Sequence, residues 1–272
     1  MHDIPILTDR IALDRNRSRA SAMETPATFL QEEAVLEIQE RLKQINRTFT
    51  EPAIVTGFSE IWADIVPNAA ILPDTEILDL KPGAHDLVIH AMGLHWANDP
   101  VGQLAQALQS LRPDGLFLAV LFGGNTLMEL RDSLARAEVS VSGGLSPRIA
   151  PMGELRDLGS LLQRAGFALP VADSTNTTVT YETAFHLMRD LRAMGEANAL
   201  ADRNRRPLRR SVIAQAAANY QETYGQDGRI PATFEMIVLT GWAPSENQQK
   251  PLRPGSATSR LADALGTNES PL

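Results

Sequence analysis

Residues 86–122 contain an apolar run, an amphipathic segment and a second apolar run, and this order restricts the fold more than any other feature of the sequence. The runs Asp86–Met92 and Leu116–Phe122 are apolar almost throughout, which is typical of parallel strands covered on both faces. Between them, Asp99-Pro100 is a helix start and Pro113-Asp114-Gly115 a stop. A strand, a helix and a strand in this order predict a parallel crossover unit.

The same alternation continues along most of the chain. It predicts further strands at 53–57, 69–72, 76–80, 167–171, 175–181 and 232–240. It predicts further helices from Pro26 to Phe49, at 58–66, after a capping box Thr126-x-x-Glu129, and at 152–165. The expected fold is therefore α/β, with a mostly parallel sheet and helices on both faces.

The pattern also divides the chain into regions. We expect an Arg-rich N-terminal arm with little periodicity at 1–24, one domain at 25–243, and a Pro/Gln/Ser-rich tail at 244–272. Within the domain, residues from about 182 to 226 are predicted to be a helical insertion before the last strand. The stretch from Leu72 to Asp86 is too short for a helix between two strands, so the first half of the fold is shortened.

Composition excludes several classes of function. The chain has no cysteine, which excludes disulfides, thiolate metal sites and a cysteine nucleophile. Its net charge is −8, although 22 of its 25 cationic residues are arginine, so we expect no nucleic-acid partner. The longest apolar run is Leu116–Phe122, far short of the roughly 18–20 residues of a membrane span. The five histidines are scattered and predict no metal site, and the expected location is cytoplasmic.

Several segments match a known superfamily in order. Asp86-Leu87-Val88, Leu94–Asp99, Leu111–Gly115 and Leu116–Val120 resemble the second half of class I S-adenosylmethionine-dependent methyltransferases, which have a Rossmann-like fold. One branch of that superfamily is indicated by Gly123–Leu127, Ser146-Pro147-Arg148, Gln163–Phe167, Gln248–Leu252 and Gly255-Ser256-Ala257. This branch contains a respiratory complex I assembly factor that acts as a protein arginine hydroxylase. It is similar to the malonyl-carrier-protein O-methyltransferase of biotin synthesis.

The resemblance implies S-adenosylmethionine as cofactor, and the following residues are the candidates for binding it: Thr56, Gly57, Asp74, Met92, His95 and Trp96. Methyltransferases of this class place an acidic residue and two or three glycines after the first strand, because the backbone passes close to the ligand. Here Gly57 is the one glycine that remains, and Phe58 and Glu60 stand where bulk is excluded in the family. Cofactor binding is therefore in question. Asp74 is the candidate for the ribose hydroxyls.

His95 and Trp96 follow the strand at 86–92, at the edge of the sheet where α/β proteins bind ligands. They are predicted either to face a pocket or to pack at the start of a helix with the histidine hydrogen-bonded. His90 lies within the strand and is predicted to be a buried, hydrogen-bonded histidine.

Arginines supply the candidates for substrate or partner binding. Arg203, Arg205 and Arg206 lie in a cationic link within the insertion, and guanidinium groups suit an acidic partner or a phosphate-bearing carrier arm. The alternative is a solvated helix start. Arg148 is predicted to line the mouth of a pocket, where Asp157 is a candidate partner. No catalytic residue is identified from the sequence.

Three functions are compatible with these residues. The first is an enzyme of the methyltransferase fold that acts on a protein side chain or a carrier-bound carboxylate, since methyl transfer from a sulfonium depends on alignment more than on a strong base. The second is a non-catalytic assembly factor that holds a partner. The third, implied by the resemblance, is protein arginine hydroxylation with an unidentified cofactor. The expected partner is a protein or a carrier-bound substrate, with peripheral membrane association through a respiratory-complex subunit.

Overall fold

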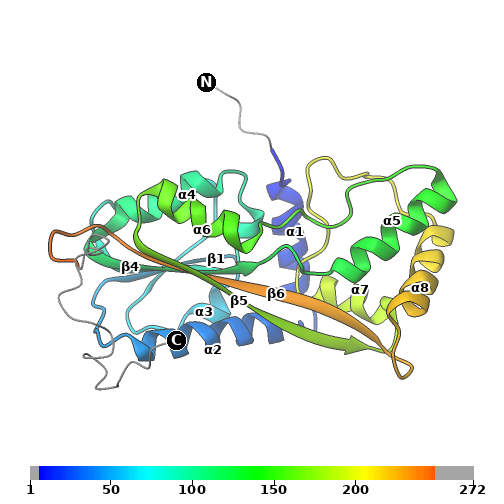
Figure 1. Cartoon of the computed structure of the whole chain (residues 1–272), viewed down its shortest axis with the longest axis horizontal. Coiled ribbons are helices and arrows are strands. Elements are labelled where there is room, and N and C mark those ends of the chain that lie inside the picture. Colours follow the sequence, from blue (N-terminus) through cyan, green and yellow to red (C-terminus); the bar gives the residue numbers. More distant parts are fainter. Residues whose placement is uncertain (1–5, 249–272) are drawn as a thin grey trace, which may run out of the picture.

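The computed structural model describes residues 6–248 and contains both helices and strands (Figure 1). The helices are α1 (Arg10–Ser21), α2 (Phe29–Gln44), α3 (Ser59–Trp62), α4 (Pro100–Ser110), α5 (Met128–Ser142), α6 (Leu155–Ala165), α7 (Ala184–Ala193) and α8 (Arg210–Tyr224), with a short 3-10 helix η1 (Leu94–Trp96). The strands are β1 (Pro52–Thr56), β2 (Ala70–Leu72), β3 (His85–Ala91), β4 (Leu111–Phe122), β5 (Ala168–Tyr181) and β6 (Ile230–Trp242).

The strands form one sheet in the order β2-β1-β3-β4-β6-β5. β1 pairs in parallel with β2 and with β3, and β3 pairs in parallel with β4. β6 is antiparallel to both of its neighbours. The predicted crossover unit is confirmed, because α4 connects the parallel strands β3 and β4. The chain therefore has the predicted α/β fold with a mostly parallel sheet.

Both faces of the sheet are covered by helices. Successive side chains of a strand point to opposite faces, so Val88 of β3 packs with residues of α4 and α6, whereas Leu87 and Ile89 pack with residues of α2. Figure 1 shows α4 and α6 on one side of the sheet and α2 and α3 on the other. This two-sided burial explains why the central strands are apolar at nearly every position.

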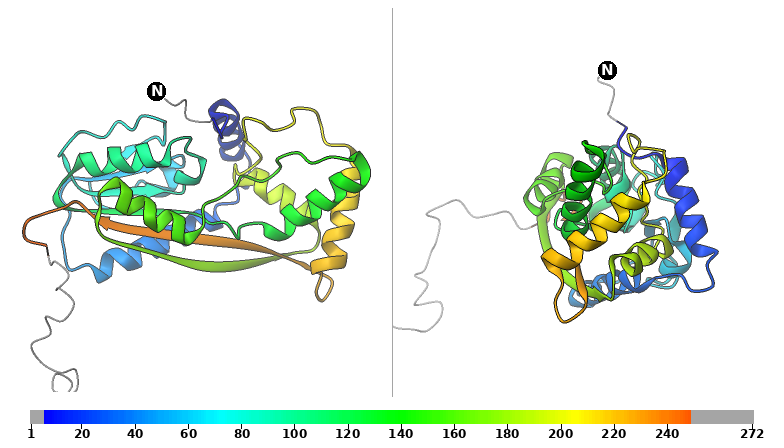
Figure 2. Two further views of the ribbon diagram at one scale, coloured as in Figure 1. Left: turned by 45° about the horizontal axis from the view of Figure 1, so that its top comes forward. Right: turned by 90° about the vertical axis from the view of Figure 1, so that its right-hand side faces the viewer.

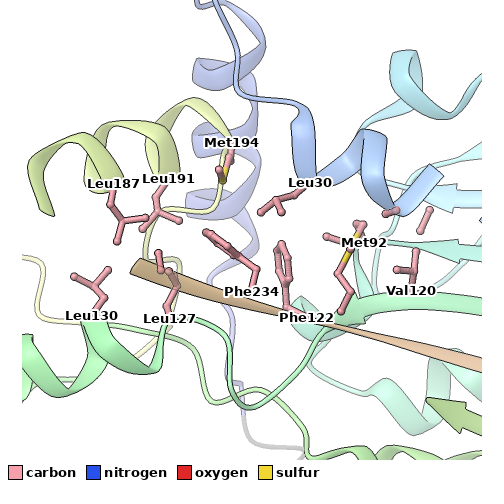
Figure 3. Packing of buried hydrophobic residues seen from close by; sticks show 14 of the residues in the cluster. Leu30, Met92, Val120, Phe122, Leu127, Leu130, Leu187, Leu191, Met194 and Phe234 are labelled. Carbon is pink, nitrogen blue, oxygen red and sulfur yellow. The ribbon is translucent and has the colours of Figure 1, made fainter. Parts of the chain in front are cut away.

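β5 and β6 extend beyond the rest of the sheet. β6 pairs with β4 only from Met236 to Trp242, whereas its pairing with β5 continues to Ile230. Helices α5, α7 and α8 pack against this extension (Figure 2). Leu187 and Leu191 of α7 join Phe234 of β6 in the same apolar cluster (Figure 3). The helices predicted before the last strand are thus confirmed, and they build a second lobe beside the sheet.

The N-terminal arm is predicted wrongly for residues 10–21, which form α1. The Asp9 side chain accepts a hydrogen bond from Ala12 N at 3.0 Å and caps the helix. Leu13 is fully buried and belongs to an apolar cluster with residues of η1 and of the chain after α7. The apolar stripe is hard to recognise because Arg17, on the same side of the helix, is buried as well.

Two strand predictions also differ from the structure. Residues 76–80 form a loop, in which Leu78 N donates to Gln106 Oε1 at 2.8 Å rather than to a neighbouring strand. Residues 167–171 and 175–181 belong largely to the single strand β5, with a register shift between Ala168 and Val171. Residues 249–272 of the predicted tail lie outside the described residues.

The capping box predicted at Thr126-x-x-Glu129 is not formed. α5 begins at Met128, after Leu127 in the left-handed conformation with a φ of 56°. The side chains of Thr126 and Glu129 bind β6 instead: Thr126 Oγ1 donates to Glu235 O at 3.2 Å, and Glu129 accepts from Thr233. Tertiary hydrogen bonds have replaced the local ones that the pattern predicts.

The docking of α1 can be measured by a matched pair of substitutions. We expect Leu13→Ala to lower the free energy of unfolding by roughly 2–5 kcal/mol, because it leaves a cavity at a fully buried position. Ile11→Ala on the same helix is the control, since Ile11 is 81% exposed. Urea denaturation of both variants measures the difference. Equal stabilities would contradict the docking of α1.

Candidate functional site

The candidate site lies at the carboxyl ends of β1 and β3. The chain order reverses there, because β2 lies on one side of β1 and β3 on the other, and open α/β sheets bind ligands at such a point. Thr56, the last residue of β1, is in register with Ala91, the last residue of β3. The structure brings the predicted residues Thr56, Gly57 and Asp74 together along a groove of about 570 Å³ beside α1.

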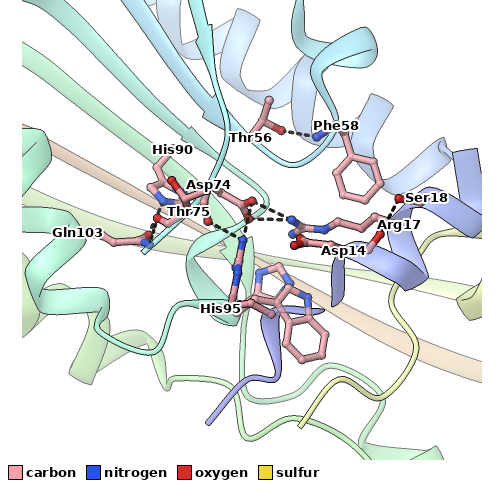
Figure 4. Close-up of polar contacts among 12 residues, drawn as sticks. Asp14, Arg17, Ser18, Thr56, Phe58, Asp74, Thr75, His90, His95 and Gln103 are labelled. Carbon is pink, nitrogen blue, oxygen red and sulfur yellow. Dashed lines mark hydrogen bonds and ion pairs between the residues drawn. The ribbon is translucent and has the colours of Figure 1, made fainter. Parts of the chain in front are cut away.

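A buried ion pair fills the crevice between these residues. Arg17 Nη1 of α1 donates to both carboxylate oxygens of Asp74, at 2.8 and 2.9 Å (Figure 4). Arg10, two turns earlier on the helix, donates to Asp74 Oδ1 at 3.1 Å and to Asp74 O at 2.7 Å. The side chains of Arg17 and Asp74 are only 7% and 5% exposed. The pair is therefore largely removed from water.

Two glycines border this ion pair closely. A Cβ on Gly57 would lie 2.1 Å from Arg17 Nη1, and a Cβ on Gly93 would lie 2.5 Å from Asp74 Oδ2. The Phe58 ring centroid is 5.3 Å from Arg17 Cζ, a cation–π distance. Because Gly57 and Gly93 have no side chains, the Arg17 guanidinium and the Asp74 carboxylate can lie close to the backbone after β1 and β3.

The charge state of Asp74 follows from these contacts. Burial alone would raise the pKa of Asp74, but the charges and hydrogen bonds of Arg17 and Arg10 outweigh it and hold the pKa below its ordinary value. Asp74 is therefore ionised at neutral pH. Its two oxygens are both engaged by guanidinium donors.

His90 is buried and hydrogen-bonded, as predicted. Its Nε2 lies 2.8 Å from Gln103 Oε1, and Gln103 Nε2 donates to Thr75 O at 2.9 Å. Burial lowers the pKa of His90, although the Gln103 hydrogen bond and the Asp74 charge oppose the shift, so the ring is neutral at pH 7. This network connects β3 and α4 to the loop that carries Asp74.

Met92 and the residues of η1 lie on the other side of the crevice. Met92 follows β3 with a φ of 51°, and its side chain is fully buried in the core (Figure 3). Trp96 Nε1 donates to Glu196 Oε2 at 2.8 Å, and His95 Nε2 lies 3.6 Å from the same oxygen. The structure thus joins His95 and Trp96 to Glu196, a residue that the sequence reasoning did not select.

Glu196 has an incomplete set of hydrogen bonds among the described residues. Its side chain is 8% exposed, and Oε1 is buried without a donor. Both ring nitrogens of His95 are likewise buried without a hydrogen-bond partner, so the alternative of a fully hydrogen-bonded His95 is not what the structure shows. Buried polar atoms without a partner are costly and uncommon in folded proteins. This grouping therefore marks a candidate position for a ligand.

An apolar cavity of about 180 Å³ lies beside Trp96 and Glu196. Residues of η1, the end of β4, α5, α7 and β6 line it. Its apolar walls include Phe122, Leu130, Ile149, Met188, Leu191 and Phe234. Arg148, Arg192 and Asn198 supply polar atoms to its lining. The cavity thus combines an apolar interior with a few charged groups, which is the usual composition of a small binding site.

The predicted partner-binding arginines are separated in the structure. Arg148 lines the cavity, and its Nε donates to Glu138 Oε1 at 2.9 Å, so Glu138 rather than Asp157 is its partner. Arg203 donates to Asp9 Oδ2 at 2.9 Å, and Arg205 Nη2 lies 3.6 Å from the same atom. Arg206 is exposed. Arg203 and Arg205 therefore help to anchor the start of α1, and partner binding by these residues stays a prediction.

Arg17 and Glu196 are the residues that the sequence reasoning missed. The seven-residue spacing of Arg10 and Arg17, with Leu13 between them, is the helical signal that could have placed both arginines on one side of a helix. For Glu196 the signal was the preceding Gly195, which predicts the end of a helix and a fixed turn.

Several proteins of known name are similar to this chain, although the sequence matches no family model. It is 42% identical over 199 residues to a zebrafish (Danio rerio) protein named arginine-hydroxylase NDUFAF5, mitochondrial, covering 73% of this chain and 62% of that protein. It is 35% identical over 187 residues to the malonyl-[acyl-carrier protein] O-methyltransferase of Laribacter hongkongensis, covering 69% of this chain and 61% of that protein. The chain thus spans about three fifths of the length of these relatives.

Among solved structures, the YcgJ protein from Bacillus subtilis has a similar fold, with a TM-score of 0.50, 13% sequence identity, and coverage of 79% of this chain and 99% of that chain. The sheet has a Rossmann-like methyltransferase fold. The predicted resemblance to the class I S-adenosylmethionine-dependent methyltransferase superfamily is confirmed by the sequence relatives. Within it, the sequence is similar to the relatives named arginine-hydroxylase NDUFAF5 and malonyl-[acyl-carrier protein] O-methyltransferase.

The crevice as arranged does not fit S-adenosylmethionine. The space against Gly57 contains the Arg17 guanidinium, and the space against Gly93 contains the Asp74 carboxylate. Asp74, the candidate for the ribose hydroxyls, has both oxygens bound by Arg17.

Two further features are absent from the part of the chain that the structure describes. Between residues 6 and 248 there is no group of three or more His, Cys, Asp or Glu side chains placed to hold a metal ion. In the same range, none of the helices has the length and apolar character needed to cross a membrane.

The ion pair makes stability depend on pH. Because the folded-state pKa of Asp74 lies below its unfolded value near about 4, its contribution is present above that pH and is lost as the pH falls through the folded pKa. We expect Asp74→Asn to cost roughly 3–5 kcal/mol of unfolding free energy at neutral pH, and to cost progressively less in acid.

Urea denaturation between neutral pH and the acid limit of folding measures this difference. Asp79→Asn is the control, since Asp79 lies exposed on the same loop. A loss of stability in Asp74→Asn that stays constant down to acid pH would contradict the assigned role of the Asp74 charge.

Proposed function

We propose that this chain holds an arginine side chain of a protein partner in the cavity beside Glu196, and that it acts in this way in the assembly of respiratory complex I. The observation that carries the proposal is Glu196, which lines the apolar cavity and whose carboxylate oxygen Oε1 is buried without a donor among residues 6–248. A guanidinium supplies N–H donors and a positive charge to such an oxygen. The three methylenes of an arginine side chain suit the apolar walls.

The neighbours of Glu196 favour this ligand. Trp96 Nε1 engages Oε2 at 2.8 Å and thereby fixes the carboxylate, which leaves Oε1 for a second donor. Trp96 also lines the cavity, where an indole ring favours a bound cation. The carboxylate is therefore oriented before a ligand arrives, which lowers the cost of binding.

The Glu196 carboxylate favours a cation beside it over an anion. A malonyl carboxylate would need a cation, and of the two arginines in the lining Arg148 is already bound to Glu138, which leaves Arg192. Such a ligand would also approach the Glu196 carboxylate and be repelled. Among the two kinds of relatives, this arrangement is more compatible with those named arginine-hydroxylase than with those named malonyl-[acyl-carrier protein] O-methyltransferase. The proposal includes no methyl transfer, because Arg17 occupies the cofactor crevice.

Calorimetric titration with a blocked glycine peptide that carries one central arginine tests the binding site. A peptide with citrulline at the same position is the matched ligand, since citrulline keeps the shape and lacks the charge. We expect the arginine peptide to bind at least about tenfold more tightly than the citrulline peptide. Glu196→Gln should weaken arginine binding roughly 30-fold and remove this preference, because a buried charge pair loses one partner.

Glu182→Gln is the matched control, because the Glu182 side chain is 71% exposed, and it should bind like the unmodified chain. Equal affinity for arginine and citrulline peptides, or unchanged binding by Glu196→Gln, would reject the site.

The assembly role is tested in the organism that encodes the chain. We expect deletion of the gene to lower the amount of assembled complex I, measured on native gels and by NADH:quinone activity. The unmodified chain and Glu182→Gln should restore the complex, whereas Glu196→Gln should not. A normal level of complex I in the deletion strain would reject the assembly role without affecting the result of the peptide titration.

A further inference from the structure

We infer that Arg17 is an internal plug of the cofactor crevice: α1 inserts its guanidinium between Gly57 and Asp74 and excludes an adenosyl ligand. The inference concerns the edge of β1 and β3 and does not depend on arginine binding at Glu196. Three observations support it: the close contacts of the Arg17 guanidinium, the hydrogen bonds that hold the start of α1, and the groove beside α1.

The fit of the guanidinium is close on several sides. Arg17 Nη1 lies where a side chain on Gly57 would begin, and it binds both oxygens of Asp74. Phe58 faces Arg17 Cζ at 5.3 Å from the ring centroid. Phe58 is one of the bulky residues that follow Gly57, and its ring packs against the plug. The loss of glycines after β1 and the burial of Arg17 are thus two parts of one arrangement.

The helix that carries the plug is anchored at its start. Asp9 caps α1 and also accepts from Arg203 Nη2 at 2.9 Å. Asp9 N donates to Ala199 O at 2.8 Å, and Thr8 forms an isolated antiparallel bridge with Leu200. α1 is therefore fixed to the segment after α7, and the plug does not rest on the ion pair alone.

The groove of about 570 Å³ beside α1 continues from the plug along β2. It is lined by Thr56, Leu72 and Asp74 on the sheet side and by Asp14, Arg17 and Ser18 of α1. Gly57 also lines this groove, and removal of the Arg17 side chain would widen the groove at Gly57. Asp74 would then have a free oxygen for a ribose hydroxyl, and Arg10 would still balance its charge.

Titration with S-adenosylhomocysteine, followed by calorimetry, tests the plug. We expect the unmodified chain not to bind S-adenosylhomocysteine at concentrations up to about 1 mM. Arg17→Ala should bind it with a dissociation constant at least about tenfold below that limit. Arg15→Ala is the matched control, since Arg15 lies exposed on the same helix, and it should behave like the unmodified chain. Binding to the unmodified chain, or no gain in a folded Arg17→Ala, would overturn the inference.

A second measurement does not depend on any ligand and uses Gly57. We expect Gly57→Ala to lower the melting temperature of the unmodified chain, because the new Cβ would meet Arg17 Nη1 at 2.1 Å. The same substitution should cost clearly less in Arg17→Met, which keeps an apolar stem against Phe58 and lacks the guanidinium. Equal losses in both backgrounds would show that Arg17 does not fill the space against Gly57 and would overturn the inference.

Discussion

The buried ion pair between Arg17 and Asp74 determines how the N-terminal helix meets the sheet. A buried ion pair contributes little net stability, because desolvation of both charges offsets their attraction, but breaking it is strongly unfavourable. The pair therefore acts mainly as a constraint on position. α1 buries only Ala12, Leu13, Arg17 and Ala20, and such a small apolar surface fits more than one register. The demand that Arg17 reach Asp74 selects one of them.

The long β5–β6 ribbon has the second large effect on the site. Residues Ile230–Glu235 of β6 have no β4 residue paired with them. The space beyond the end of β4 is therefore open to α5 and α7. Phe234 of β6 lines this space, and the carboxylate of the next residue, Glu235, accepts from Asn125 N at 2.9 Å and fixes the chain after β4. The apolar cavity therefore depends on the length of β6. If β6 extended no further than β4, it would not provide Phe234 to the cavity wall.

Sequence alone predicts the parts of the fold that depend on local pattern. The apolar run of β3 and the stop at Pro113-Asp114-Gly115 are sufficient to identify the crossover unit. The site is less accessible to this reasoning, because its residues are far apart in the chain. Arg17 reaches Asp74 across 57 positions, and Trp96 reaches Glu196 across 100. The buried side of α1 combines Leu13 and alanines with the charged Arg17, so its apolar stripe is weak and hydrophobic periodicity alone does not reveal it.

The crevice and the cavity are built on a single turn. α7 ends at Ala193 and is followed by Met194 and by Gly195, which has a φ of 79°. Glu196 N donates back to Leu191 O at 3.0 Å, the hydrogen bond of a glycine-terminated helix end. A Cβ on Gly195 would lie 3.1 Å from Arg17 Cα, so this turn is in close contact with α1. The next residue, Glu196, binds Trp96 and faces the cavity. The position of the plug and the orientation of the free carboxylate oxygen therefore share one structural support, and a helix α1 displaced from the crevice removes one wall of the turn that presents Glu196.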